Sequence, residues 1–379
     1  MDFDFSDDQE MLRDSVRKWV DKGYGFEQRR ATVKAGGFSP QAWRGLADLG
    51  LTGLQVPEDQ GGMGFGPIDA MVVMEELGRG IVLEPYAAVA LVATHLLKCG
   101  DQALAPLLGG IASGDKLVVL AHQERKARYR LAHVETTATK RADGHWSLNG
   151  AKTVVPAGAQ ADAFIVPARV SGAVDDEAGI ALFLVAKDAP GVQIKGYGTQ
   201  DGASAADVTL KDAEAAELLA AGPAFIALEE AIDIGIAAVC AEAVGVMDKL
   251  VGVTVEYMNT RKQFNVPIAS FQALRHRMAD VKMQLELARS MSYYASLKLG
   301  EPAAARRRAL AQAKAQLGTS MRFVGQQCIQ LHGGIGVTDE YIASHYFKRL
   351  TVIEMTYGDT MHQIGEVSSR MQDTAGVFA

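Results

Sequence analysis

Residues 302–334 read PAAARRRALAQAKAQLGTSMRFVGQQCIQLHGG. Apolar residues recur in this stretch at seven-residue intervals: Leu310, Leu317, Val324 and Leu331. Such a seam buries one face of a helix against neighbouring helices. The pair Gly333-Gly334 is typical of a helix C-terminus, because glycine readily adopts the left-handed backbone found there. The stretch therefore predicts one long helix that begins near Pro302 and belongs to a helical bundle.

The surrounding sequence divides into three regions. Residues 225–379 predict long helices, including one over 227–261 and one over 271–299, and we expect a C-terminal four-helix bundle domain there. Residues 1–118 also predict helices, since Ser6 is followed by acidic residues and both Ser39-Pro40 and Pro67 are helix-start signals. These residues predict an N-terminal helical domain.

Residues 119–224 predict a middle domain made of strands. Asp143-Gly144 and Asn149-Gly150 are typical hairpin turns. Short runs rich in β-branched residues lie at 134–139, 152–155, 163–170, 180–185 and 206–210. No helix-length pattern separates these runs, which favours a small antiparallel β-barrel or sandwich over a parallel sheet, and we expect the barrel. The fold class is therefore α+β, with the barrel between two helical domains.

Composition argues against several function classes. The formal net charge of −7 and the pI near 5.7 disfavour a general nucleic-acid binder, which would normally carry a basic excess. Three widely spaced cysteines and an acidic N-terminus without an apolar signal core predict a cytoplasmic protein. No apolar run is long enough for a membrane span, and the histidines show no metal-ligand spacing.

Three strings carry a resemblance to a known family. Residues 257–280 read YMNTRKQFNVPIASFQALRHRMAD, residues 330–341 read QLHGGIGVTDEY, and residues 57–64 read PEDQGGMG. Their order, with the helix–strand–helix organisation, is similar to the acyl-CoA dehydrogenase flavoproteins along essentially the whole chain. The glycine-rich string alone would not indicate a dinucleotide fold, because no βαβ unit surrounds it.

The resemblance implies a cofactor and a set of residues that bind it. Family members are tetramers that oxidise acyl-CoA thioesters to trans-2-enoyl-CoA, with FAD at a dimer interface. The arginine that matches Arg261 contacts the pyrophosphate of FAD held mainly by the other subunit, a role suited to the forked guanidinium. The resemblance also implies electron-transfer flavoprotein as electron acceptor. The other matched cofactor-binding positions are Gln263, Phe264, Gln272, Gln330 and Gly334.

Two segments depart from the family pattern. A Thr-Glu-x-x-x-Gly-Ser-Asp segment, whose hydroxyls bond to the flavin and its pyrophosphate, is replaced at residues 121–130 by AHQERKARYR. A Trp-Ile-Thr-Asn run, whose Trp stacks on the flavin and whose Thr meets N5, is replaced at residues 154–157 by VVPA. Valine cannot stack as tryptophan does, and proline offers no hydroxyl.

The catalytic base of the family also lacks a counterpart. Its two known places are held here by Tyr357 or Gly358, and by Gly235. None of these removes an α-proton at neutral pH. Asp359 is the next carboxylate along the chain, and it is either a weak candidate for the base or the N-cap of the following helix. Asp233 matches an acidic position that contacts the pantetheine arm of CoA, so we expect it to bind substrate.

The departures resemble one branch of the family. Residues 121–124 (AHQE), 155–162 (VPAGAQAD) and 357–359 (YGD) are similar to small subunits of the pimeloyl-CoA dehydrogenase type. Three functions remain open: an active dehydrogenase that uses Asp359, a base-deficient small subunit that completes the FAD site of a larger subunit, and a flavin-free CoA-binding or scaffold subunit. The second is favoured, as a heterotetramer with a larger subunit or as a homo-oligomer, and acyl-CoA is the expected substrate.

Overall fold

The computed structural model describes residues 5–142 and 144–371. The chain forms two compact units, each described by itself. The helical unit comprises Met1–Gln28, Pro67–Val82 and Ile236–Ala379, and the β unit comprises Arg29–Gly66 and Leu83–Gly235. Two helices, α2 (Phe26–Lys34) and α7 (Pro223–Thr260), pass from one unit into the other. Among the described residues, no helix has the length and apolar character needed to cross a bilayer.

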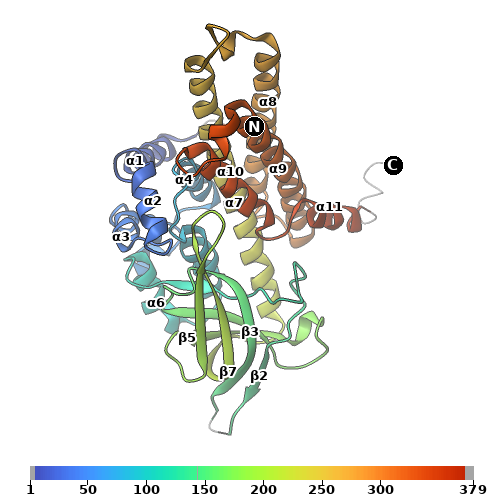
Figure 1. The fold of residues 1–379 in the computed structure, drawn as a ribbon. Coiled ribbons are helices and arrows are strands. Elements are labelled where there is room, and N and C mark those ends of the chain that lie inside the picture. The colour runs from blue at the N-terminus through green and yellow to red at the C-terminus, as the bar shows by residue number, and fades with distance from the viewer. Residues whose placement is uncertain (1–4, 143, 372–379) are drawn as a thin grey trace. The chain divides into compact units, whose positions relative to one another are not determined.

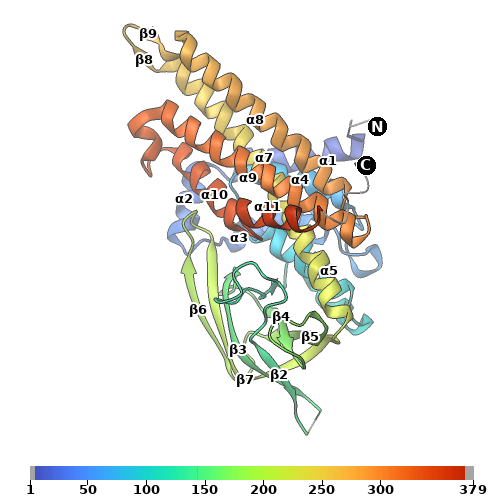
Figure 2. The same ribbon diagram turned by 90° about the vertical axis from the view of Figure 1, so that its right-hand side faces the viewer.

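The helical unit is built around the long helix expected from residues 302–334. This helix, α9, packs against three others of the same unit (Figures 1 and 2). The four seam residues, from Leu310 to Leu331, are at most 7% exposed, and the helix ends at Gly333 with a φ of 65°. The predicted long helices are therefore confirmed. The α-helices that lie wholly within the unit are α1 (Asp7–Gly23), α4 (Pro67–Arg79), α8 (Gln272–Leu297), α9 (Ala303–His332), α10 (Ile342–Met355) and α11 (Thr360–Ser369).

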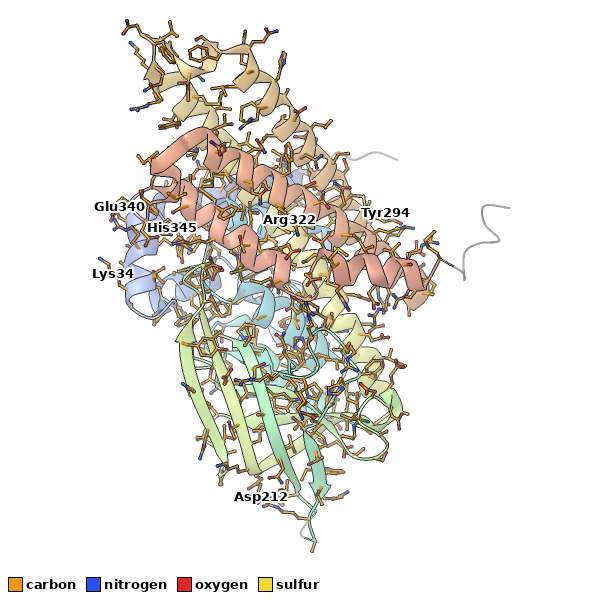
Figure 3. The ribbon with its side chains drawn as sticks, turned by 45° about the vertical axis from the view of Figure 1, so that its right-hand side comes forward. Lys34, Asp212, Tyr294, Arg322, Glu340 and His345 are labelled. Atoms are coloured by element: carbon orange, nitrogen blue, oxygen red, sulfur yellow. The ribbon has the colours of Figure 1, made fainter. Side chains whose placement is uncertain are left out.

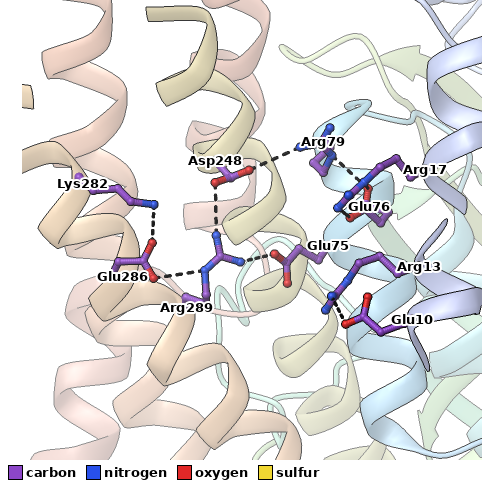
Figure 4. A network of polar contacts seen from close by, with 10 residues as sticks. All are labelled: Glu10, Arg13, Arg17, Glu75, Glu76, Arg79, Asp248, Lys282, Glu286 and Arg289. Atoms are coloured by element: carbon purple, nitrogen blue, oxygen red, sulfur yellow. Dashed lines mark hydrogen bonds and ion pairs between the residues drawn. The ribbon is translucent and has the colours of Figure 1, made fainter. Parts of the chain in front are cut away.

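Glycines and ion pairs join α4 to α7 and α8. A Cβ added at Gly245 of α7 would lie 1.8 Å from the carbonyl oxygen of Glu75 in α4, so the two backbones touch there. Figure 4 shows the polar network beside this crossing. Arg289 of α8 pairs with Glu75 and, at 3.3 Å, with Asp248 of α7. The network fixes three helices that come from distant parts of the sequence.

The β unit contains a seven-stranded sheet whose strand pairings form a ring. The strands are β1 (Val118–Leu120), β2 (Thr137–Lys140), β3 (Trp146–Pro156), β4 (Ala163–Arg169), β5 (Ile180–Ala186), β6 (Val192–Gly198) and β7 (Ser204–Leu219). The order β4-β2-β3-β7-β5 closes through β4–β5, although β2 and β4 share one residue pair only. Most pairings are antiparallel, as predicted, but β1–β4 and β2–β4 are parallel.

Helices and short turns of helix complete the β unit. They are α3 (Pro40–Asp48), α5 (Thr94–Lys98), α6 (Ala105–Ala112), a π-helix over Ala87–Ala93, and the 3₁₀ turns Leu51–Gly53, Glu58–Gln60, Gln102–Leu104 and Glu177–Gly179. The predicted N-terminal helical domain and middle β domain are thus present. Their predicted limits, 1–118 and 119–224, stay a prediction, as does the limit of the C-terminal domain at 225–379.

One predicted turn is wrong. Asn149-Gly150 lies inside the continuous strand β3, at a bulge in its register with β7. Asn149 donates to the Asp212 carboxylate at 2.9 Å, and its own side-chain oxygen accepts the Asp212 N–H, so the pair is fixed across the sheet (Figure 3 labels Asp212). Gly150 is needed because a Cβ there would lie 2.4 Å from the Thr136 hydroxyl. The other predicted turn includes Asp143, which lies outside the described residues.

Candidate functional site

Arg261 lies immediately after α7 ends. Its N–H donates to the Tyr257 carbonyl at 2.8 Å, and its own carbonyl accepts from Ile268 at 2.9 Å. These two bonds fix the backbone, while the side chain is exposed. Within residues 5–142 and 144–371, the guanidinium has no ion-pair or hydrogen-bond partner. All five of its N–H donors therefore remain available to an anion such as a pyrophosphate.

A short hairpin follows Arg261 and presents an aromatic side chain. Strands β8 (Lys262–Gln263) and β9 (Val266–Pro267) are joined by Phe264 and Asn265, whose φ values of 52° and 65° make a tight left-handed turn. The Phe264 ring is 88% exposed and meets Phe271 edge-on at 6.2 Å. Phe271 is itself 36% exposed, so both rings of this contact reach the surface. Gln263 and Gln272, the first residue of α8, are exposed on the same segment.

The second predicted cofactor segment follows α9. Gln330 and Gly334 are exposed, and a Cβ added at Gly334 would meet no atom within 4 Å. The backbone there is open to a bulky ligand. Leu331 packs in a buried cluster with Met258 and Ile268, which ties this segment to the end of α7. The structure thus brings the predicted residues from 261–272 and 330–334 to one end of the helical unit (Figure 2).

The strand segment 154–157, which the resemblance places against a flavin, is bonded to neighbouring strands through Val154. Val154 has a φ of 53°, which is costly for a β-branched residue, and its N–H points to the Tyr197 hydroxyl at 3.2 Å and the Asp207 carboxylate at 3.4 Å. The Tyr197 hydroxyl in turn donates to Asp207 at 3.0 Å. Pro156 offers neither N–H nor hydroxyl. Of the backbone positions 154 and 156, the first has its N–H engaged within the chain and the second has no N–H.

The loop that precedes this strand is anchored by a buried ion pair. Lys152 of β3 is 0% exposed and donates to Glu124 at 2.6 Å and to the Pro167 carbonyl at 2.8 Å. Glu124 also accepts from the Thr136 hydroxyl at 2.6 Å and from two backbone N–H groups. Burial opposes its ionisation, but Lys152 and these bonds hold the pKa of Glu124 below its ordinary value. The pair joins the 121–130 loop to two strands.

His122, beside this ion pair, is expected to make the stability of the folded chain depend on pH. Burial and then the Lys152 charge lower the pKa of His122 to about 4. Between pH 6.5 and pH 4 the His122 side chain is therefore protonated in the unfolded chain and neutral in the folded chain. The contribution of His122 to the free energy of unfolding is complete above pH 6.5. It falls as the pH is lowered towards 4, by up to about 3 kcal/mol. Urea unfolding between pH 4 and 7 should show this slope, and His122→Asn should flatten it. An unchanged slope would contradict the assignment.

The loop between α10 and α11 holds the predicted base positions. Burial raises the pKa of Tyr357 to about 12, so its phenol stays protonated. Asp359 is the N-cap of α11, where its carboxylate accepts the His362 N–H at 2.8 Å. Lys314, 1% exposed, donates to the Gly358 carbonyl at 3.1 Å and to Ile353 and Glu354 at the end of α10. This loop is fixed, but no free carboxylate is presented by residues 356–359.

The remaining predicted residues lie on α7 in the β unit. Asp233 is 1% exposed and Gly235 is buried. They belong to a different compact unit from Arg261 and Asp359. No group of His, Cys, Asp and Glu side chains within residues 5–142 and 144–371 could hold a metal ion.

Sequence reasoning missed the buried pair of Lys152 and Glu124 and the contact between Tyr197 and Asp207. Strand alternation did not indicate the first, because buried Leu148, Lys152 and Val155 are four and three residues apart and two bulges interrupt the register of β3 with β7. Nothing in the sequence indicated the second, since it depends on the register of β6 on β7.

Comparison with known families gives matches along most of the chain. The N-terminal, middle and C-terminal domain models of acyl-CoA dehydrogenase match residues 6–115, 120–213 and 225–372, respectively. Acyl-CoA dehydrogenase FadE12 of Mycobacterium tuberculosis is 30% identical over 355 residues, covering 89% of this chain and 88% of the relative. The N-terminal helical, middle β and C-terminal helical organisation is therefore that of a known fold.

Solved structures have the same overall fold. A variant of the Tcur3481-Tcur3483 steroid ACAD superposes with a TM-score of 0.88 and 28% identity, covering 97% of this chain and 99% of the other. A chain of the ChsE4-ChsE5 complex from Mycobacterium tuberculosis superposes with a TM-score of 0.87 and 27% identity, covering 99% and 100%.

Proposed function

Because the chain belongs to the acyl-CoA dehydrogenase family, we propose that it is the small, base-deficient subunit of an FAD-dependent acyl-CoA dehydrogenase. The assembly would oxidise an acyl-CoA thioester at its α and β carbons to a trans-2-enoyl-CoA. This chain would complete the cofactor site of a larger subunit, and the larger subunit would supply the base. The resemblance to small subunits of the pimeloyl-CoA dehydrogenase type supports this division.

The observation that carries the proposal is the difference between the two halves of the FAD site. The half that a family member gives to its neighbour fits, since Arg261 is unpaired among the described residues and Gly334 faces open space. The half that it would use itself does not fit, because the Val154 N–H is already bonded to Tyr197 and Asp207. A chain that has only the half given to a neighbour would help to bind the FAD of another chain.

The roles of the chain's own residues follow from their chemistry. Arg261 would pair with the pyrophosphate through two parallel N–H donors. Gln330 and Gly334 would meet the ADP half, with glycine allowing close backbone approach. Gln263, Phe264 and Gln272 would cover the same end, and Asp233 would contact the pantetheine arm of CoA. Bound FAD supplies the acceptor for the β-hydride.

The proposed assembly is a heterotetramer with a larger acyl-CoA dehydrogenase subunit, and electron-transfer flavoprotein is the proposed acceptor of its electrons. Two of the similar solved structures are described by pairs of protein names, ChsE4-ChsE5 and Tcur3481-Tcur3483, and the first is called a complex. Exposed apolar side chains in the hairpin after Arg261 and in the turn after α9, Phe264 at 88% and Val337 at 71%, support a covered surface in the assembly. A cytoplasmic location is part of the proposal.

Arg261→Ala tests the proposal. Loss of a charge-assisted hydrogen bond costs about 1.5–3 kcal/mol, so FAD should bind the co-expressed complex about tenfold or more weakly. The measurement is the FAD dissociation constant and the flavin content per complex. Arg322→Ala is the matched control, because this exposed arginine of α9 contacts Glu354, away from the cofactor segments (Figure 3). Equal flavin content in both variants, or a colourless complex, would favour the scaffold alternative.

A further inference from the structure

Three aromatic side chains pack together where the two cofactor segments meet. His332, the last residue of α9, lies 4.6 Å from the Tyr257 ring and 5.1 Å from the Tyr341 ring, measured between centroids. The two tyrosine rings are 6.2 Å apart. Tyr257 precedes Arg261 by one helical turn, and Tyr341 follows the glycine-rich segment. The three rings, here called the aromatic triad, therefore touch both sides of the proposed FAD half-site.

A second, apolar layer lies next to the triad. Met258 and Leu331, the chain neighbours of Tyr257 and His332, pack with Ile268 at 3–8% exposure. Ile268 donates its N–H to the Arg261 carbonyl. The ends of α7 and α9 are thus joined twice, once by the aromatic triad and once by this cluster. Neither layer involves a residue proposed to touch the cofactor.

Hydrogen bonding fixes the orientation of His332. Its Nδ1 lies 2.8 Å from the Cys328 carbonyl, which can only accept, so Nδ1 carries the proton. Nε2 is then an acceptor, and among the described residues this buried atom has no partner. Burial lowers the pKa of His332, which favours the same neutral form. The ring is 3% exposed and its contacts with the two tyrosines are apolar in character.

We infer that His332 is a positioning residue: through the aromatic triad it holds the Gly333-Gly334 turn at a fixed distance from Arg261. A pyrophosphate and the ADP half attached to it span both segments, so their binding requires both to be in place at once. This inference rests on the proposed function and adds to it the element that organises the half-site. His332 itself does not contact the cofactor.

Two substitutions of His332 separate the contribution of its ring from that of its hydrogen bond to Cys328. His332→Phe keeps the ring against both tyrosines and removes the bond to Cys328. His332→Asn keeps an amide N–H near Nδ1 and removes the ring. His332→Asn therefore removes both aromatic contacts of the triad that involve residue 332, whereas His332→Phe keeps them. We expect His332→Asn to weaken FAD binding by the co-expressed complex about tenfold and His332→Phe to retain it within about twofold.

Amide hydrogen exchange on the chain alone gives a second readout that does not depend on FAD. In His332→Asn, residues 257–268 and 333–341 should both exchange faster, while the α4–α7 crossing stays protected. His145→Asn is the control, because this histidine is exposed in the β unit. A purely structural role would instead raise exchange throughout the helical unit.

The outcomes distinguish the inference from the function on which it rests. Unchanged FAD affinity in His332→Asn, with Arg261→Ala weakened, would overturn the positioning role alone. Unchanged affinity in both would overturn the proposed function. A loss in His332→Phe as large as that in His332→Asn would show that keeping the ring does not keep the site, and would reject the triad.

Discussion

Lys152→Met is expected to destabilise the protein by about 3–5 kcal/mol. Lys152 is fully buried and its ammonium is the only cation bonded to Glu124 among the described residues. Removing it leaves a carboxylate with 3% exposure and no cation bonded to it within the described residues, and breaking a buried ion pair in this way costs several kcal/mol. Chemical unfolding, with the midpoint followed by circular dichroism, measures the loss.

Two further variants identify the cause. Lys152→Met combined with Glu124→Gln removes both charges, and the amide oxygen can still accept from Thr136, so most of the stability should return. Lys126→Met breaks the exposed pair with Glu135, whose side chains are 75% and 44% exposed, and should cost less than about 1 kcal/mol. A double variant as unstable as the single one would show that lost packing, and not the unpaired carboxylate, is responsible.

Helix-forming segments could be predicted because their evidence is local. The heptad seam of α9 places Leu310, Leu317, Val324 and Leu331 on one face, and each is buried. The start signals at Ser6, Ser39 and Pro67 correspond to α1, α3 and α4. Such patterns depend on spacing and on the residue at the helix end, both of which the sequence contains.

The sheet was less predictable because its details depend on residues far apart in the chain. Asn149-Gly150 has the composition of a turn, yet cross-strand bonds to Asp212 keep it within β3. The two parallel pairings of β4 are likewise not encoded in any one segment. The residue types were enough to predict where strands occur. The register and the pairing of those strands could be seen only in the folded chain.

The candidate site was also predictable only where its residues belong to recognisable sequence segments. The resemblance indicated Arg261, Gln330 and Gly334, and the structure places their segments at one end of one unit. It could not indicate that the Val154 N–H is bonded to Tyr197 and Asp207, because that contact depends on the β6–β7 register. The proposed function rests in part on that contact.

Removing the catalytic glutamate of the larger subunit is expected to lower turnover of the complex by about 100- to 10,000-fold, while Asp359→Asn leaves it unchanged. Asp359 accepts the His362 N–H as the N-cap of α11, and asparagine is an equally good cap, so the variant should also fold normally. Asp359→Ala lacks the acceptor and should cost about 1 kcal/mol of stability without loss of turnover.

The measurement is turnover of the co-expressed complex with an acyl-CoA substrate and an artificial electron acceptor, at equal flavin content. If this chain carried its own base, Asp359→Asn would lose at least about 100-fold and removal of the partner's glutamate would leave part of the activity. That result would contradict the base-deficient assignment. The structure favours the opposite, because a cap bonded to a backbone N–H is held in place and Tyr357 keeps its proton at neutral pH. In the proposed assembly, proton abstraction would come from the larger subunit.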